Sequence, residues 1–445
     1  MIFLIKASQL IFSLSILIVL HELGHFIPAK LFKTRVEKFY LFFDPWFSLI
    51  KKKIGSTEYG IGWLPLGGYV KISGMIDESM DKGQMQKEPE PWEFRAKPAW
   101  QRLIIMLGGV TVNLFLAIFI YSMTLYWYGE EYLPNNNLTN GVWCVDPLVV
   151  DLGFQNGDKI ISVDKKPITR FSSIVESLLE AKSVTVEREG RYLDLPIPNN
   201  FIEKLIESNP SMLFYPRIPV IVADIISGSN AEKGGLQKGD KILAVEQEEV
   251  VYFDMLKPLL SNFSGSSVSV LVNRDGNEKT LYVDVSKEGR LGFAPAMLSL
   301  SELSELGYYT LNEERYGFFA AFPAGYKKAI SKLNSYMAQA KLILNPKTGA
   351  YKGLGGFGAI GNLFPPKWDW EVFWNLTAFL SIILAFMNIL PIPALDGGHV
   401  MFLLYEMLVG KPAPEKVIEY AQIIGMILLL GLVLYANGND IMRLF

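Results

Sequence analysis

Cysteine and histidine are scarce in this 445-residue chain, which has one cysteine, Cys144, and three histidines. A single cysteine excludes an intramolecular disulfide and any zinc site built from several thiolates. The net charge of −3 and the lack of a long basic cluster give no sign of a nucleic-acid partner. A transition-metal site in this chain would therefore have to be built from nitrogen and oxygen ligands.

Charge is missing from long stretches of the chain, of which 50% of the residues are hydrophobic. Four segments meet or approach the length of a membrane-spanning helix: Ile2 to Leu31, Leu103 to Tyr128, Val372 to Leu395 and Tyr420 to Asn439. The first lacks a small-residue cleavage site, so we interpret it as a retained span, with Pro28 expected to bend or end its helix. A polytopic α-helical membrane protein with soluble parts is expected.

Basic residues are distributed unevenly between the loops. Residues 30–102 contain 13 Lys and Arg, whereas residues 129–158 contain none. Positively charged loops tend to stay in the cytoplasm. We therefore expect the first loop in the cytoplasm and the long insert after the second span on the opposite side, together with both termini.

The first span contains the sequence His21-Glu22-Leu23-Gly24-His25. On a helix, His21 and His25 share one face and can reach the same metal ion, for which Zn²⁺ is suited. Glu22 would then act as general base on a water molecule at that metal. The alternatives are a chance match or a buried histidine pair satisfied by hydrogen bonds. A zinc ion would offset the cost of placing ionisable groups inside a span.

The third span ends in the sequence NILPIPALDGGH, which runs from Asn388 to His399. Pro391 and Pro393 forbid a continuous helix, so extended backbone is expected from Leu390 to Ala394. Asp396 follows at span depth, where its carboxylate would complete a two-histidine zinc site and leave a fourth position for water. The alternative role for Asp396 is to cap the next helix.

Other polar or small residues of the spans have open roles. Asn388 could hold the backbone of a substrate or bridge its own broken helix. His399 could lie next to the metal, as a hydrogen-bond donor or a further nitrogen, or have no part in the site. In the second span, Gly108 and Gly109 allow close helix packing, and Asn113 allows one polar contact.

The first loop contains the glycine-rich segment Glu58 to Ile72, EYGIGWLPLGGYVKI. We interpret it as a β-hairpin with Gly67 and Gly68 at or near the turn. The lack of charge between Tyr59 and Val70 suggests that the hairpin dips into the membrane beside the site. The alternative is a soluble amphipathic hairpin.

The insert between the second and third spans contains an internal repeat. Gly153 to Ile168 reads GFQNGDKIISVDKKPI, and Gly235 to Val250 reads GLQKGDKILAVEQEEV, at a spacing of 82 residues. Each copy resembles the bacterial form of the α+β PDZ fold, so we expect PDZ-like domains at residues 138–205 and 215–295. PDZ domains bind peptides by strand addition, although a steric shield is the alternative here. Residues 296–368 are expected to be an amphipathic helical and Gly-rich linker between core halves 1–128 and 369–445.

The motifs in combination resemble those of the site-2 protease family of intramembrane zinc metalloproteases, specifically the bacterial branch that cleaves anti-sigma factors. The resemblance rests on H-E-x-x-H in the first span, N-x-x-P-x-P-x-L-D-G in a later one and the tandem PDZ-like domains between them. It covers essentially the whole chain. One departure is Val110, where family members commonly carry proline.

The resemblance implies roles for individual residues. The zinc ligands would be His21, His25 and Asp396, and the catalytic base Glu22. An unwound substrate segment would be held by Asn388, Pro391, Pro393, Gly67 and Gly68, with Asn113 and His399 as candidates for contacts behind the ligands.

The resemblance also implies a zinc metalloendopeptidase that cleaves single-pass membrane proteins in envelope stress signalling. Its place would be the bacterial inner membrane, with the active site toward the cytoplasm and the PDZ-like domains in the periplasm. The alternative is a membrane-anchored, peptide-binding scaffold or sensor with a vestigial metal site.

Overall fold

The computed structural model describes residues 2–65, 67–75, 88–208 and 212–442. The chain divides into two compact units. The first comprises Met1–Gly129, Arg315–Pro346 and Ala350–Phe445, and the second comprises Glu130–Glu314 with Lys347–Gly349. Each unit is described by itself.

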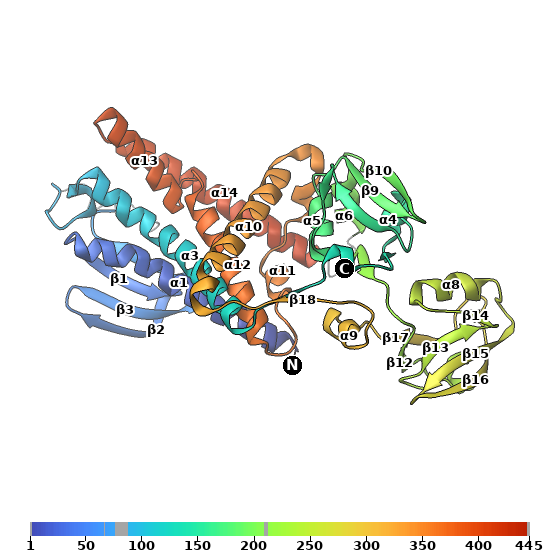
Figure 1. Cartoon of the computed structure of the whole chain (residues 1–445). Helices are drawn as coiled ribbons and strands as arrows, with labels where there is room; N and C mark the ends of the chain where they lie inside the picture. Colours follow the sequence, from blue (N-terminus) through green and yellow to red (C-terminus); the bar gives the residue numbers. More distant parts are fainter. Residues whose placement is uncertain (1, 66, 76–87, 209–211, 443–445) are drawn as a thin grey trace. The chain divides into compact units, whose positions relative to one another are not determined.

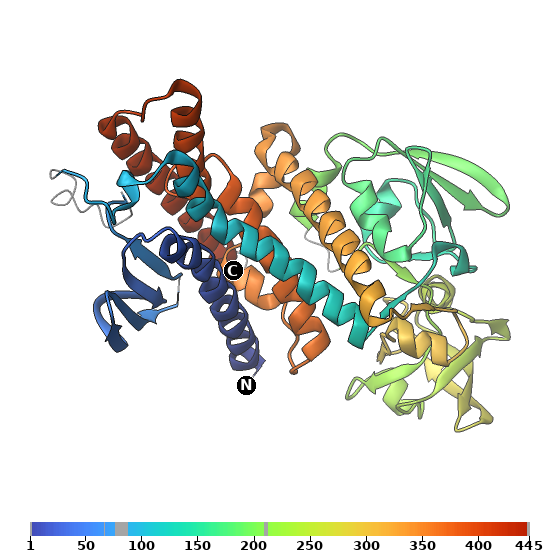
Figure 2. The ribbon, with the colours of Figure 1, turned by 60° about the vertical axis from the view of Figure 1, so that its left-hand side comes forward.

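The first unit is mainly helical, and several of its helices are long (Figure 1). They are α1 (Ile2–Leu31), α3 (Ala99–Trp127), α10 (Phe318–Leu344), α11 (Phe357–Asn362), α12 (Trp370–Ile389), α13 (Asp396–Val409) and α14 (Glu415–Met442). Four helical stretches are long and apolar enough to cross a membrane, namely α1, α3, α12 and Lys416–Met442 of α14, which confirms the four predicted spans. Helix α3 is central, because it packs against α1, α10, α12 and α13 (Figure 2).

Prolines lie near the ends of two of these helices. Helix α1 contains Pro28 and continues to Leu31, so the proline does not end it. Pro28 cannot donate the hydrogen bond to the carbonyl of Gly24, four residues earlier, and its ring crowds that carbonyl, yet the helix continues for three more residues. Helix α12 ends at Ile389, which confirms that the helix does not continue through Pro391 and Pro393 although the apolar run extends to Leu395.

A four-stranded sheet follows α1 and corrects the predicted hairpin. Its strands are β1 (Val36–Leu41), β2 (Phe43–Ile54), β3 (Thr57–Leu64) and β4 (Tyr69–Ile72), in the order β2-β3-β1-β4. The hairpin predicted over Glu58 to Ile72 is wrong, because β1 lies between β3 and β4 and pairs with both. The hairpin is formed by β2 and β3, where Gly55 has a φ of +62° in the short turn. Leu66, in the β3–β4 connection, is outside the described residues.

The second unit contains two sheets of matching topology. Its strands are β5 (Glu130–Tyr132), β6 (Val142–Cys144), β7 (Lys159–Val163), β8 (Lys166–Pro167), β9 (Ser183–Arg188), β10 (Arg191–Pro196), β11 (Phe214–Pro216), β12 (Val222–Ile225), β13 (Lys241–Val245), β14 (Glu248–Glu249), β15 (Ser267–Arg274), β16 (Asn277–Asp284), β17 (Phe293–Pro295) and β18 (Asn312–Glu314). Its helices are α4 (Pro147–Asp151), α5 (Ile174–Leu178), α6 (Phe201–Ser208), α7 (Asn230–Lys233), α8 (Phe253–Ser261) and α9 (Leu300–Glu305). The orders β10-β9-β7-β8 and β16-β15-β13-β14 correspond strand for strand.

A buried ion pair is repeated in the two sheets of the second unit. Arg188 binds Asp158 at 2.7 Å, and Arg274 binds Asp240 at the same distance. Each arginine also donates to the backbone carbonyl of the glycine that opens the repeat, Gly153 or Gly235. The sequence repeat is therefore also a repeat of structure.

Candidate active site

Helices α1 and α3 cross closely at glycine residues. A Cβ atom at Gly24 would overlap the carbonyl oxygen of Gly108, and one at Gly108 would overlap the carbonyl oxygen of Gly24. A Cβ atom at Gly109 would lie 2.5 Å from Nε2 of His25 and 2.5 Å from Cε1 of His21. The missing side chains therefore leave room for the two imidazoles between the helices.

The two histidines of α1 face the same point. Their rings lie 4.8 Å apart at 82°, and their Nε2 atoms are 3.2 Å apart. Nδ1 of His25 lies 2.8 Å from the backbone carbonyl oxygen of Ile105 in α3, which can only accept a hydrogen bond. His25 therefore carries its proton on Nδ1 and presents a lone pair at Nε2.

A turn between α12 and α13 brings Asp396 to the histidines. The amide of Leu395 donates to the carbonyl of Ile392 over 3.1 Å, and Ala394 has a φ of +75°. These features, with Pro393 at the second position, are those of a type II turn. The extended backbone predicted over Leu390 to Ala394 is therefore limited to its start, because proline suits a turn as well as a strand.

Asp396 is the first residue of α13 and does not cap it. The N-cap residue is Leu395, and no side chain accepts a hydrogen bond there. Oδ2 of Asp396 lies 3.2 Å from Nε2 of His21 and 3.3 Å from Nε2 of His25. The alternative role as a helix cap is thus not the one that the side chain adopts.

These three atoms fit a metal ion. Oδ2 of Asp396 is buried and has no hydrogen-bond partner among the described residues. Tetrahedral zinc with bonds of about 2.0–2.1 Å separates its ligand atoms by about 3.3–3.4 Å. The observed separations of 3.2, 3.2 and 3.3 Å match that edge length. A metal cation between the three atoms would satisfy all of them at once, so the donor set fits Zn²⁺.

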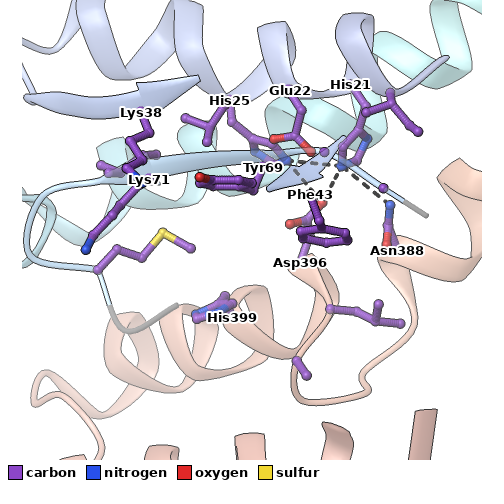
Figure 3. Close-up of a pocket in the computed structure, with 18 of the residues that line it drawn as sticks. His21, Glu22, His25, Lys38, Phe43, Tyr69, Lys71, Asn388, Asp396 and His399 are labelled. Carbon is purple, nitrogen blue, oxygen red and sulfur yellow. Dashed lines mark hydrogen bonds and ion pairs between the residues drawn. The ribbon is translucent and has the colours of Figure 1, made fainter. Parts of the chain in front are cut away.

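The three residues border a cavity of about 740 Å³. Glu22 lines the same cavity, and Figure 3 shows its carboxylate near the two imidazoles, with Asp396 below them. The opposite wall is the sheet, since all of β4 lines the cavity. A Cβ atom at Gly68 would lie 2.5 Å from Ile18 and 3.7 Å from Cγ of Glu22. Gly68 therefore lies directly against the turn of α1 from Ile18 to Glu22.

The other residues singled out in the sequence are placed at different points around this cavity. Asn388 lines it, with its side-chain nitrogen 3.5 Å from Nε2 of His21. His399 also lines it but lies apart from the three-residue cluster and contacts Gln422 at 3.2 Å (Figure 3). Pro391 and Pro393 are not among the described lining residues and instead shape the turn before Asp396.

Asn113 of α3 supports the other histidine, His21. Its side-chain nitrogen lies 3.1 Å from Nδ1 of His21, while its Oδ1 is buried with no hydrogen-bond partner among the described residues. A half-turn of this amide places Oδ1 where it accepts a hydrogen bond from Nδ1 of His21. Ser381 of α12 donates to the Asn113 backbone carbonyl at 2.7 Å.

Sequence reasoning missed several contributors to the site. The carbonyl of Ile105 left no signal, because any residue type supplies one. Gln422 did leave a signal, since it is a buried polar residue in the fourth span, and such residues in spans are rarely idle. Phe43 and Asp44 were missed because the strand that carries them was not predicted beside the cavity.

The chain is similar in sequence to known proteins over nearly their full lengths. A sequence profile of peptidase family M50 matches residues 9–432. The chain is 28% identical to the regulator of sigma E protease of Haemophilus influenzae, over 99% of this chain and 100% of that protein. It is also 28% identical to the regulator of sigma-E protease RseP of Escherichia coli, over 99% of each. A Borreliella burgdorferi protein whose name includes the words zinc metalloprotease is 27% identical over 98% of each.

These matches confirm the resemblance to the site-2 proteases, and they do not favour the alternative of a scaffold with a vestigial metal site. The family profile covers both catalytic motifs and the insert between them. The chain therefore belongs to peptidase family M50 and is a zinc metalloendopeptidase of the site-2 type.

Proposed function

We propose that the protein cleaves peptide bonds in or next to the transmembrane segments of single-pass membrane proteins such as anti-sigma factors. His21, His25 and Asp396 would hold the zinc ion, and Glu22 would be the general base. The observation that carries this proposal is the convergence of three potential ligand atoms, 3.2 to 3.3 Å apart, beside a carboxylate in one cavity.

The chemistry would be divided between the metal and the side chains of this chain. When bound, Zn²⁺ supplies a Lewis acid that polarises the scissile carbonyl and increases the acidity of water. Glu22 takes the proton from the attacking water and passes it to the leaving amine. Ile105 and Asn113 hold the two imidazoles so that each presents Nε2 to the site.

The substrate must be unwound before its carbonyls can react, because a helix engages them in internal hydrogen bonds. Strand β4 is well placed to hold an unwound segment, since it is an edge strand whose four residues all line the cavity. Addition of the substrate as a further strand would replace the lost hydrogen bonds. Asn388 and the Gly67-Gly68 segment border the same space and would contact its backbone.

We also propose an orientation and a role for the second unit. The 13 basic residues between Lys30 and Arg102 support a bacterial inner-membrane protein with its active site toward the cytoplasm and its insert in the periplasm. The matching sheets and the repeated Arg–Asp pairs support two PDZ-like domains at residues 138–205 and 215–295. Such domains would bind peptide ends or restrict the size of the substrates that reach the cavity.

Two variants of the detergent-purified protein test the assigned roles. Glu22→Gln should retain stoichiometric zinc and lose cleavage of single-span substrates by about 10²-fold or more. Asp396→Ala should lose zinc, whereas Asp369→Ala, which removes the carboxylate that caps α12, should keep it. Full cleavage by Glu22→Gln, or undiminished zinc affinity in Asp396→Ala, would refute the corresponding role.

The substrate class is tested separately. Wild-type protein is incubated with a panel of single-span membrane proteins and with an unfolded soluble protein, each with and without a chelator. Chelator-sensitive cleavage confined to the span or its edge is expected. Cleavage of the soluble chain alone would contradict the proposed substrate class.

A further inference from the structure

Strand β2 exposes an unusual run of apolar side chains. Trp46 is 91% exposed, Phe47 56%, Leu49 60% and Ile50 64%. The strand is an edge of its sheet, so its outer backbone groups also have no partner strand among the described residues. Soluble proteins cover or interrupt an edge of this kind. This strand therefore requires a covering surface.

Aromatic rings hold this part of the strand in a fixed conformation. Trp63 of β3 stacks on both Trp46 and Phe47, with ring centroids 6.2 and 5.8 Å away. Its indole nitrogen also donates to the carbonyl of Pro45 at 2.9 Å. Contacts with Trp63 thus hold the exposed rings in place. Tryptophan is enriched in the membrane–water interface.

The contacts of the sheet with α1 indicate the depth of β2. At one end, Phe43 lies against Gly67, and the adjacent Gly68 lies against Ile18. At the other end, Thr57, which pairs with the last residue of β2, accepts a hydrogen bond from Lys30 over 2.9 Å. Strands β3 and β1 separate β2 from β4, but these contacts at its two ends match β2 to the stretch of α1 from Ile18 to Lys30. Because α1 is long and apolar enough to cross a membrane, we expect the apolar half of β2 at bilayer depth.

Three consecutive lysines occupy the other half of the strand. Lys51, Lys52 and Lys53 are exposed and pair with Gly60, Tyr59 and Glu58 of β3. They precede the turn that contacts Lys30, so they lie where the first span leaves the apolar layer. Lysines at this level face lipid headgroups, and anionic headgroups complement their charge.

We propose that β2 is a docking surface for the bilayer itself: Trp46 to Ile50 insert among the acyl chains, and Lys51 to Lys53 bind anionic headgroups. Phe43, Asp44 and Pro45 at the start of the same strand line the catalytic cavity. The lipid composition would therefore act on the cavity wall through one strand. This last consequence rests on the proposed function, whereas the docking itself does not.

The test measures the depth of β2 in bilayers with the full chain. Cys144 is the single native cysteine, so Cys144→Ala with Leu49→Cys gives a site for one nitroxide label. The labelled protein is placed in nanodiscs of phosphatidylcholine alone or with 30% phosphatidylglycerol. Electron paramagnetic resonance then compares the access of oxygen and of a water-soluble nickel chelate to the label.

The label should be buried in lipid when phosphatidylglycerol is present and become accessible to nickel in Lys51→Gln/Lys52→Gln/Lys53→Gln. Each lysine near an anionic surface is worth about fivefold in a binding ratio, so the triple variant should shift the ratio of docked to undocked strand by about a hundredfold. High salt should act in the same direction. The matched control is Lys165→Gln/Lys166→Gln/Lys238→Gln, three exposed lysines of the second unit, and should change nothing.

Other outcomes would overturn the proposal. Lysines can also guard an edge strand against pairing, and a label depth independent of lipid charge and of the triple variant would support that role instead. Zinc content and cleavage measured in detergent keep this test apart from the proposed function. The triple variant should match wild type there, and a loss of zinc would assign the lysines to the fold of the site. The depth measurement also remains informative if wild-type protein binds no zinc.

Discussion

Replacing Gly109 of α3 by alanine should weaken zinc binding by His21 and His25 without destabilising α3 itself. The new Cβ atom would lie 2.5 Å from Nε2 of His25, whereas ordinary contacts begin at 3.4 Å. One of the two groups must therefore move by about 0.9 Å, from 3.4 minus 2.5. Zinc sites tolerate deviations of about 0.2 Å in their ligand distances. We expect the zinc affinity to fall by at least about tenfold to a hundredfold.

Helix propensity favours alanine over glycine, so a loss of zinc affinity in this variant could not be attributed to a weaker helix. Alanine in place of glycine stabilises a helix interior by about 1 kcal/mol, so α3 itself should not be weakened. The matched control is Gly431→Ala in α14, where no atom lies within 4 Å of the new Cβ.

The assay is a zinc competition titration against a coloured chelator, with size-exclusion chromatography of each detergent-purified variant. Wild-type affinity in Gly109→Ala would refute the steric reasoning. An equal loss in both variants would show that the ligand contact is not its cause.

Two further predictions concern the turn before Asp396 and the repeated ion pair. Ala394→Val should lower zinc occupancy, because a β-branched residue tolerates a φ of +75° poorly. Ala394→Gly should retain zinc, because glycine adopts a positive φ without strain. Equal metal content in the two variants would contradict this prediction. In the second unit, burial opposes ionisation of Asp240, but Arg274 and the Gln237 amide outweigh it and hold the pKa of the carboxyl below its ordinary value. A lowered native pKa stabilises the fold above the ordinary aspartate range, and this stability is lost as the pH falls through the native value. Asp240→Asn should therefore unfold more readily at pH 7 and lose less stability on acidification, which thermal unfolding followed by circular dichroism would reveal.

The sequence predicted the elements whose signals are local. The apolar run from Ile2 to Leu31 has the bounds of α1, because a span is marked by a long stretch of mostly apolar residues. The spacing of His21 and His25 was sufficient to place both rings on one face. Asp396 could be assigned because its flanking prolines and glycines mark a break in a span.

The sheet could not be predicted in the same way. The pairing of β1 between β3 and β4 depends on contacts between segments that no local pattern relates. Gly67 and Gly68 indicated a turn, yet neither has a positive φ, and Gly68 instead allows the chain to pass close to Ile18. The exposure of Trp46 likewise follows from its place on an edge, which periodicity does not reveal.

The close crossing of α1 and α3 has a mechanical consequence. Gly24 contacts Gly108 one residue before His25, so α1 and α3 would rotate relative to each other about a point next to the metal ligands. If a thinner or thicker membrane changes the tilt of the two helices, their ends are displaced most and their crossing point least. The two histidines of α1 would then keep their hydrogen-bond partners on α3, Ile105 and Asn113, when the membrane changes thickness.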